Sequence, residues 1–170
     1  MRTRVLAATT AILLAFGAGD TARAQGFFEE KSWKESEAPA PPSVDFTKLI
    51  AFNMAPGLGL AYGVDPASVK ISKSDSLVRY VMVATSATGV RNVMYEAIRC
   101  STAEFKTYAR YSSDGQWRLV ENPEWRSMLN NMQSKHALQF ARAGACDAGT
   151  PVSSVAELVN KLKYFDQQHP

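Results

Sequence analysis

The sequence predicts an α+β domain, an antiparallel β-meander of about five to six strands packed with two to three C-terminal helices. Two observations predict it. Runs of β-branched and aromatic residues, separated by turn residues, fill the middle of the chain. Helical periodicity and helix-start signals follow in the last third.

The first 24 residues have the three parts of a secretory signal peptide. Arg2 and Arg4 give a positive start, an apolar run covers residues 5–18, and Ala22-Arg23-Ala24 is a small-x-small cleavage pattern. The run is shorter than the ~20 apolar residues of a membrane-spanning helix. We therefore expect a periplasmic or secreted protein that begins at Gln25 and has no membrane span.

The mature chain of 146 residues suits one domain with a core of ordinary size. Its net charge falls from +3 to about +1 when the signal peptide is removed, and its acidic and basic residues are interspersed. Nucleic acids and anionic membranes are bound by clustered positive charge, so neither partner is expected.

Residues 25–45 are expected to form a flexible lead-in to the domain. Charged residues surround Trp33, and the proline-rich residues 38–42 favour an extended polyproline II chain. Trp33 has two interpretations, because it either docks back on the domain or is available to a partner. The domain is expected over residues 46–165, with a tail at 166–170.

The predicted strands follow one another along the middle of the chain. After a short edge element near residues 46–52, they cover 60–64, 68–72, 77–83, 90–100, 105–111 and 117–120. Thr88-Gly89 provides the turn between the two longest strands. If a three-residue loop joins these strands, Tyr80 lies opposite Glu96 and Arg79 lies opposite Ala97.

Three helical segments are expected in the last third. Asn122-Pro123 is a helix start, followed by an apolar stripe of Trp125, Met128, Leu129 and Met132. A second segment covers residues 137–143 and stops at Gly144. Ser154-x-x-Glu157 is a capping box for a final helix with the stripe Val155, Leu158, Val159 and Leu162.

Cys100 and Cys146 are expected to form a disulfide, because an even pair in an exported protein is most simply bonded. Closing a loop of this length stabilises the fold by about 4 kcal/mol in the chain-entropy model. A redox or metal role would need Cys-x-x-Cys spacing or neighbouring ligands, and the sequence has neither.

The most distinctive polar residues lie on the two longest predicted strands. Arg79, Tyr95 and Arg99 share one sheet face in the expected register, where they can hold the carboxylate or phosphate of a ligand. Alternatively, the arginines are paired with Glu104 or Glu121 at the rim of the sheet. Glu96 is either a buried acid with a raised pKa or a carboxylate satisfied by Arg79 or backbone donors.

The sequence assigns no catalytic residue, cofactor or metal. Only His136 and His169 are histidines, and no cluster of metal-ligand residues is visible. A surface or helix-capping role for His136 is the simpler interpretation. A hydrolase using His136 requires a serine or a carboxylate within hydrogen-bond reach of the ring.

Several segments are more specific than generic strands. They are Trp33-Lys34-Glu35, Tyr62-Gly63-Val64-Asp65, residues 76–80, residues 92–100, Tyr108-Ala109, Asp114-Gly115-x-Trp117, Trp125 and Cys146. In these segments the chain resembles the exported bacterial CNP-one-like family, named after a "cryptic neisserial protein", over most of residues 33–146. That family has Asp-Gly where this chain has Asp75-Ser76. The resemblance implies an envelope protein and supplies no catalytic residues.

Three functions follow as hypotheses. The first is a non-enzymatic periplasmic protein, monomeric or weakly associated, that binds an envelope partner or has a structural role, with Trp33 as a contact. The second is a small domain that binds an anionic ligand through Arg79, Tyr95 and Arg99, with Glu96 beside them. The third is an envelope hydrolase that uses His136.

Overall fold

The computed structural model describes residues 32–52, 59–131 and 134–168. The predicted signal peptide and Met132 lie outside these ranges. From Trp33 onward the described residues belong to one compact unit. The expected α+β architecture is confirmed, with more strands than the five to six predicted.

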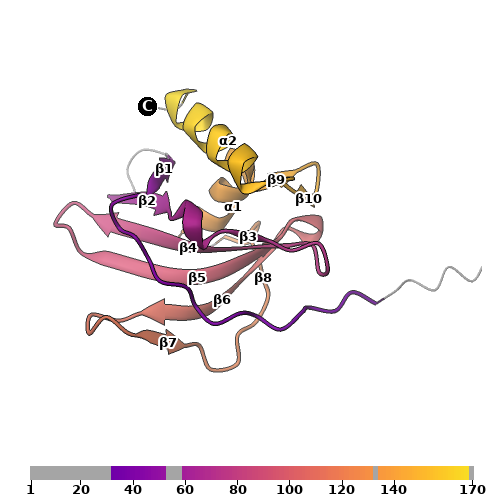
Figure 1. Cartoon of the computed structure of the whole chain (residues 1–170), viewed down its shortest axis with the longest axis horizontal. Coiled ribbons are helices and arrows are strands. Elements are labelled where there is room, and N and C mark those ends of the chain that lie inside the picture. Colours follow the sequence, from indigo (N-terminus) through magenta and orange to yellow (C-terminus); the bar gives the residue numbers. More distant parts are fainter. Residues whose placement is uncertain (1–31, 53–58, 132–133, 169–170) are drawn as a thin grey trace, which may run out of the picture. The chain divides into compact units, whose positions relative to one another are not determined.

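An antiparallel sheet is the centre of the fold, and its main path runs β1-β2-β4-β5-β6-β7 (Figure 1). Two short strands extend it, because β3 pairs with β4 and β8 pairs with β6. The strands are β1 (Ile50–Phe52), β2 (Leu60–Val64), β3 (Lys70–Ile71), β4 (Leu77–Ser86), β5 (Arg91–Arg99), β6 (Glu104–Tyr111), β7 (Trp117–Leu119) and β8 (Arg126–Ser127).

The β4–β5 hairpin has the register that the sequence predicts. Tyr80 pairs with Glu96 and Arg79 pairs with Ala97, and the turn leads through Gly89 at φ +83°. Because side chains alternate along a strand, the hairpin separates two sheet faces. The first face carries Tyr80 and Glu96, and the second face carries Arg79 and Tyr95.

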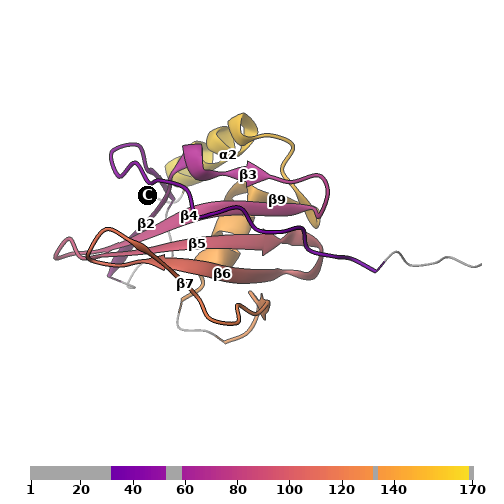
Figure 2. The same ribbon diagram turned by 60° about the horizontal axis from the view of Figure 1, so that its bottom comes forward.

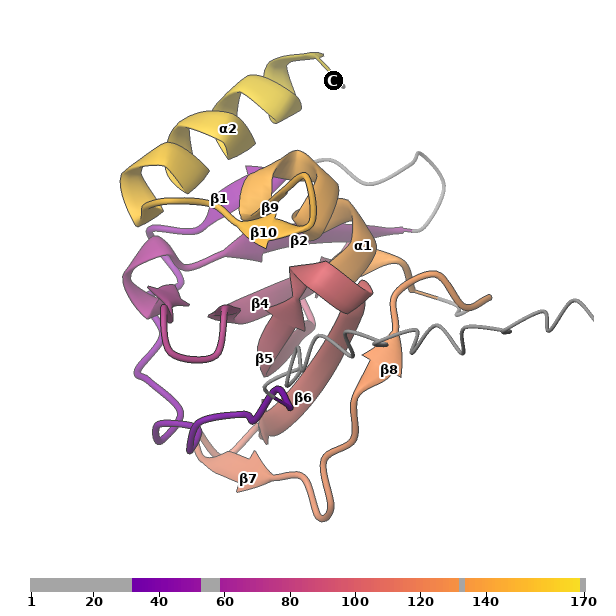
Figure 3. The same cartoon turned by 90° about the vertical axis from the view of Figure 1, so that its right-hand side faces the viewer.

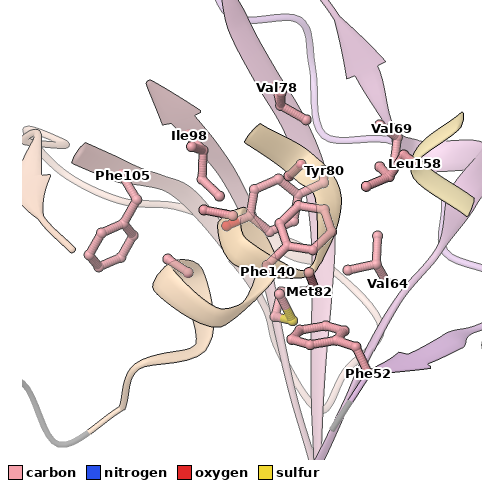
Figure 4. Close-up of a cluster of buried hydrophobic side chains, with 14 of the residues drawn as sticks. Phe52, Val64, Val69, Val78, Tyr80, Met82, Ile98, Phe105, Phe140 and Leu158 are labelled. Carbon is pink, nitrogen blue, oxygen red and sulfur yellow. The ribbon is translucent and has the colours of Figure 1, made fainter. Parts of the chain in front are cut away.

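The first face is covered by the C-terminal elements, α1 (His136–Phe140) and α2 (Val155–Gln168). Phe140 of α1 packs on Tyr80 with 4.4 Å between the ring centroids, and Figure 4 shows both rings over β4. Leu158 of α2 is buried in the same core beside Val69 and Val64. Burying aromatic and aliphatic side chains of this size supplies about 1.5–3 kcal/mol each.

The second face is covered by residues 33–49, a segment that we name the strap. The strap contains no strand, and it contributes Trp33, Ala38, Val44, Phe46 and Leu49 to a core with Val81, Val83 and Tyr95. Figure 2 shows the strap crossing in front of β4 and β5, with α1 behind them. Figure 3 shows α1 and the strap on opposite sides of these strands. The sequence predicts a flexible lead-in here, whereas from Trp33 onward the chain is docked.

The helix predicted from Asn122-Pro123 does not form. Asn122 adopts φ +52°, which is not the extended conformation of a helix N-cap, and Arg126–Ser127 pairs with β6 instead. Trp125 packs on the second face and Met128 is buried in the first core, while Leu129 is exposed. The residues of the predicted stripe therefore serve different surfaces, and tertiary contacts outweigh the helical pattern.

The C-terminal elements are joined to the sheet by the disulfide between Cys100 and Cys146, which closes a separation of 46 residues. Cys146 lies in a small hairpin of β9 (Cys146–Asp147) and β10 (Thr150–Pro151). Gly144 ends the preceding helical segment at φ +142°, and a Cβ there would lie 2.5 Å from Lys161 of α2. The predicted N-cap of α2 is present, since Ser154 Oγ accepts the N–H of Glu157 at 3.1 Å.

Candidate functional site

Arg79, Tyr95 and Arg99 share the second face, as the register predicts, but they are engaged within the protein. Arg79 donates to Asp75 Oδ2 at 2.7 Å, and both side chains are almost completely buried. Arg99 lies over the ring of Trp33 at 3.8 Å and 3.8 Å from Glu104, the pairing that the sequence offered. This face therefore presents its cations to the strap.

Asp75 anchors the strap from the loop before β4. It accepts hydrogen bonds from the backbone N–H and the hydroxyl of Ser36, and its carbonyl accepts the Trp33 indole N–H at 2.8 Å. Burial favours the neutral acid, but the bonds from Arg79 and Ser36 outweigh it and hold the pKa of Asp75 well below its usual value. Of the two interpretations of Trp33, the structure shows the docked one.

Glu35 of the strap fills a carboxylate site on the second face. Its carboxylate accepts from Lys106 Nζ at 2.6 Å, Tyr108 Oη at 2.6 Å and Trp125 Nε1 at 3.0 Å. Burial raises the pKa of Glu35, and these three donors lower it below the usual value overall. The anion-binding chemistry expected on this face is thus satisfied by a carboxylate of the same chain.

Glu96 lies on the opposite, first face and is completely buried. Its carboxylate accepts hydrogen bonds from Tyr80 at 3.1 Å, Thr107 at 2.9 Å and the His136 ring at 2.9 Å. Burial raises the pKa of Glu96, but His136 and the hydroxyl donors reverse the shift, so the pKa is lowered. Glu96 is the buried acid that the sequence offered, but its pKa is lowered and not raised. Arg79 is not its partner, because Arg79 projects from the other face.

His136 is neither exposed nor isolated. At the start of α1 it lies between Glu96, on Nε2, and Ser134, whose Oγ is 2.8 Å from Nδ1. The ring stacks on Tyr62 with 6.0 Å between centroids, and the Tyr62 hydroxyl is 3.2 Å from Ser134 Oγ. The condition for a hydrolase, a serine or carboxylate within reach of the ring, is met by both groups.

A pocket of about 240 Å³ opens beside this network on the first face. It is lined by Leu60, Tyr62, Ala84, Asn92, Met94, Glu96, Arg110, Arg126, Ser134 and His136. Its lining includes apolar side chains, hydroxyl and imidazole groups, and the two exposed arginines Arg110 and Arg126. Perturbed ionisable groups beside a concave surface are typical of binding and catalytic sites.

The two arginines are exposed, and the described residues give neither of them a charged partner. No ion pair of Arg110 or Arg126 is present within the described ranges, and Arg126 lies over the Phe105 ring at 4.8 Å. Both also line a neighbouring hollow of about 220 Å³, where Glu124 is the one acidic wall residue. The rim of the pocket is therefore positive and can attract an anion.

A β-bulge explains why sequence reasoning misses Arg110. The β5–β6 register shifts between Tyr95 and Glu96, so that Thr107 lies opposite Glu96 while Arg110 lies opposite Met94. An unbroken ladder would place Arg110 on the second face, since one residue of slip exchanges the faces. Tyr62, Arg126 and Ser134 were missed as well, and the Ser134-x-His136 spacing is the one sequence signal near them.

Among the residues that the structure describes, no group of three or more histidine, cysteine or acidic side chains is arranged to hold a metal. In the same part of the chain, neither helix has the length and apolar content that a membrane crossing requires. The chemistry that this site offers is hydrogen bonding, proton exchange at an imidazole and attraction of an anion.

Comparison with protein families gives one match, to the CNP1-like family, over residues 28–163. The chain belongs to this family. The resemblance seen in the sequence is thereby confirmed, and it extends beyond residues 33–146 at both ends. Comparison with curated proteins and with solved structures finds no match.

Ser76 of this CNP1-like protein adopts φ +56° in the turn before β4, a left-handed backbone conformation that favours glycine.

Proposed function

We propose that this chain is an exported protein that binds a small anionic ligand in the pocket between Ser134, His136 and the two arginines. The observation that carries the proposal is the pair Arg110 and Arg126, which line the same pocket and have no ion-pair partner among the residues that the structure describes. Guanidinium groups bind carboxylates and phosphates through charge-assisted hydrogen bonds. This proposal takes up the second of the three hypotheses, anionic-ligand binding, and moves the site to the opposite face from the one that the sequence suggests.

The inner wall supports the same proposal. Burying the Glu96–His136 pair costs desolvation free energy that an apolar core would avoid. Such a pair is therefore more readily explained where it orients groups that meet a ligand, here the hydroxyls of Ser134 and Tyr62. A pocket of about 240 Å³ is below the ~300–1,000 Å³ of drug-sized sites, which favours a small ligand.

Binding is tested by calorimetric titration with a panel of small anions that includes phosphate, acetate, succinate and benzoate. We expect saturable binding of at least one anion, weakened about tenfold or more by Arg110→Gln or Arg126→Gln. Arg118→Gln is the matched control, because Arg118 of β7 is an exposed arginine paired with Asp114 in the turn between β6 and β7. Equal weakening by all three changes would indicate a net-charge effect and contradict the proposal.

Export is proposed from the predicted signal peptide, and the Cys100–Cys146 disulfide supports it because disulfides persist in oxidising compartments. Expressed from its full coding sequence in a bacterium, the protein should be recovered from the periplasmic fraction with a mass that begins at Gln25. Recovery from the cytosol with residues 1–24 intact would contradict export.

A further inference from the structure

A directional hydrogen-bond chain leads from the pocket into the core. Glu96 also accepts from Tyr80 and Thr107, so its carboxylate acts as an acceptor throughout. The bond to His136 then requires a proton on Nε2, and in the neutral imidazole Nδ1 accepts the hydroxyl proton of Ser134 at 2.8 Å. We propose that Ser134 is an activated nucleophile and that the pocket hydrolyses short esters whose acyl part ends in a carboxylate.

A capping serine is the simpler explanation of Ser134, and the distances argue against it. The backbone N–H of His136 lies 3.4 Å from Ser134 Oγ, which makes a weak cap. The bond to the imidazole is much shorter, and a cap needs no buried carboxylate behind the ring. Ser134 is half-buried and lines the pocket, so its Oγ is accessible to a ligand there.

The three groups have the roles of a nucleophile, a general base and a positioning carboxylate. Serine here contacts Nδ1 and the carboxylate contacts Nε2, an exchange of the two ring nitrogens that leaves proton transfer unchanged. Glu96 fixes the tautomer and stabilises the imidazolium that forms. Tyr62, whose hydroxyl is 3.2 Å from Ser134 Oγ, is placed to donate to the developing oxyanion.

The reaction balances as ester plus water giving acid plus alcohol. Ser134 Oγ attacks the carbonyl carbon while its proton moves to His136 Nδ1, and that proton leaves with the alcohol as the ester bond breaks. Water then attacks the acyl group on Ser134 and gives a proton to Nδ1. Release of the acid returns this proton to Oγ.

The substrate class follows from the rest of the pocket and rests on the proposed function. Arg110 and Arg126 at the rim select a negative charge on the acyl chain. The apolar lining residues Leu60, Ala84 and Met94 accept a short apolar segment between that charge and the carbonyl. A pocket of about 240 Å³ leaves no room for a long chain.

The nucleophile is tested with an alkyl fluorophosphonate probe, followed by peptide mass spectrometry. We expect the full-length, disulfide-bonded protein to be labelled on Ser134, with labelling absent in Ser134→Ala and at least tenfold slower in His136→Gln. Ser127→Ala is the matched control, because Ser127 is another half-buried serine nearby that caps a backbone N–H. Labelling of another residue, or unchanged labelling in His136→Gln, overturns the proposal.

The positioning role of Glu96 is tested by the rate at which the probe labels Ser134, because a residue that only stabilises the fold would not change this rate in the folded protein. Glu96→Gln should slow labelling of Ser134 at least tenfold while the near-ultraviolet circular dichroism, which reports the packed aromatic core, is retained. Equal labelling rates in this variant and in the unchanged protein contradict the role.

The substrate class is tested by comparing the 4-nitrophenyl monoester of succinic acid with 4-nitrophenyl acetate. Arg110→Gln should lower kcat/KM for the charged ester about tenfold more than kcat/KM for the neutral ester, and Ser134→Ala should abolish both activities. Anion binding without labelling of Ser134 refutes the nucleophile and leaves the binding function intact. If Ser134 is labelled but kcat/KM is equal for the two esters, the preference for a charged substrate is refuted, and so is the role of the arginines in selecting the substrate.

Discussion

Glu96 is the residue on which the first face of the sheet depends, because one buried carboxylate accepts bonds from three different elements. Removing it leaves the hydroxyls of Tyr80 and Thr107 and the His136 ring without their acceptor. Glu96→Ala should lower the free energy of unfolding by about 3–5 kcal/mol, as measured by urea denaturation. The exposed Glu121→Ala should change it by less than about 0.5 kcal/mol, and a similar cost for both would show that the network contributes little.

Asp75 makes stability depend on pH. Its folded pKa lies well below the ordinary value of 3.8, so its contribution is fully present above that value and is lost as the pH falls below it. The pKa values of Glu35 and Glu96 are also lowered in the folded protein, so these residues add further losses of stability that begin as the pH falls below about 4.5. The urea midpoint should therefore decline between about pH 5 and about pH 2.

Asp75→Asn provides the check on this assignment. The change leaves Arg79 buried without its counter-charge, so we expect a loss of about 3 kcal/mol at neutral pH. It should also flatten the acid decline, whereas Asp114→Asn, in an exposed ion pair, should leave the decline nearly unchanged. An equally steep decline in Asp75→Asn would contradict the assignment.

The local sequence pattern predicts the pairing of Tyr80 with Glu96 but not the other residues that bind Glu96. Strand alternation and the Thr88-Gly89 turn are enough to place Tyr80 opposite Glu96. The bond from Glu96 to His136 joins residues forty positions apart, through the packing of α1 on the sheet. No local period reports such a contact, so the network was outside the reach of sequence reasoning.

Among the elements, the strap shows how side chains alone can hold a segment that has no strand or helix. Trp33 supplies an indole bond to Asp75, a cation–π contact with Arg99 and an edge contact with Trp125 at 5.8 Å. Trp33→Ala should cost about 3 kcal/mol of unfolding free energy and speed hydrogen exchange in residues 33–46. Lys34→Ala, at an exposed neighbouring position, is the control, and an equal effect of the two would mean that Trp33 does not hold the strap.

The lead-in and the residues after Asn122 were mispredicted for the same physical reason. Neither segment has a regular hydrophobic pattern that matches its own structure. The strap is held by packing on the second face, and the residues after Asn122 are held by pairing with β6 and by packing of Trp125 on the second face. The final helix was predicted correctly because its capping box and apolar stripe are local signals. Signals within one element are readable from sequence, whereas docking between elements is not.

In the whole molecule, the two faces of one sheet have different roles. The second face is closed by the strap, which supplies its own carboxylate to the cationic site. The first face is closed by α1 and α2 over part of its area and open at the pocket. The sequence predicted an anion-binding face and the correct fold class, but the bulge in β6 and the docked strap move the available cations to the other face.

A nuclear magnetic resonance titration shows directly whether the pocket on the first face is the ligand site. The protein is titrated with the anion that binds most tightly, and the chemical shifts of its amides and side chains are followed. If the anion binds in this pocket, we expect saturable chemical-shift changes at five residues that line it, Tyr62, Asn92, Arg110, Arg126 and Ser134. Shifts centred instead on Arg79, Arg99 and the strap would contradict it.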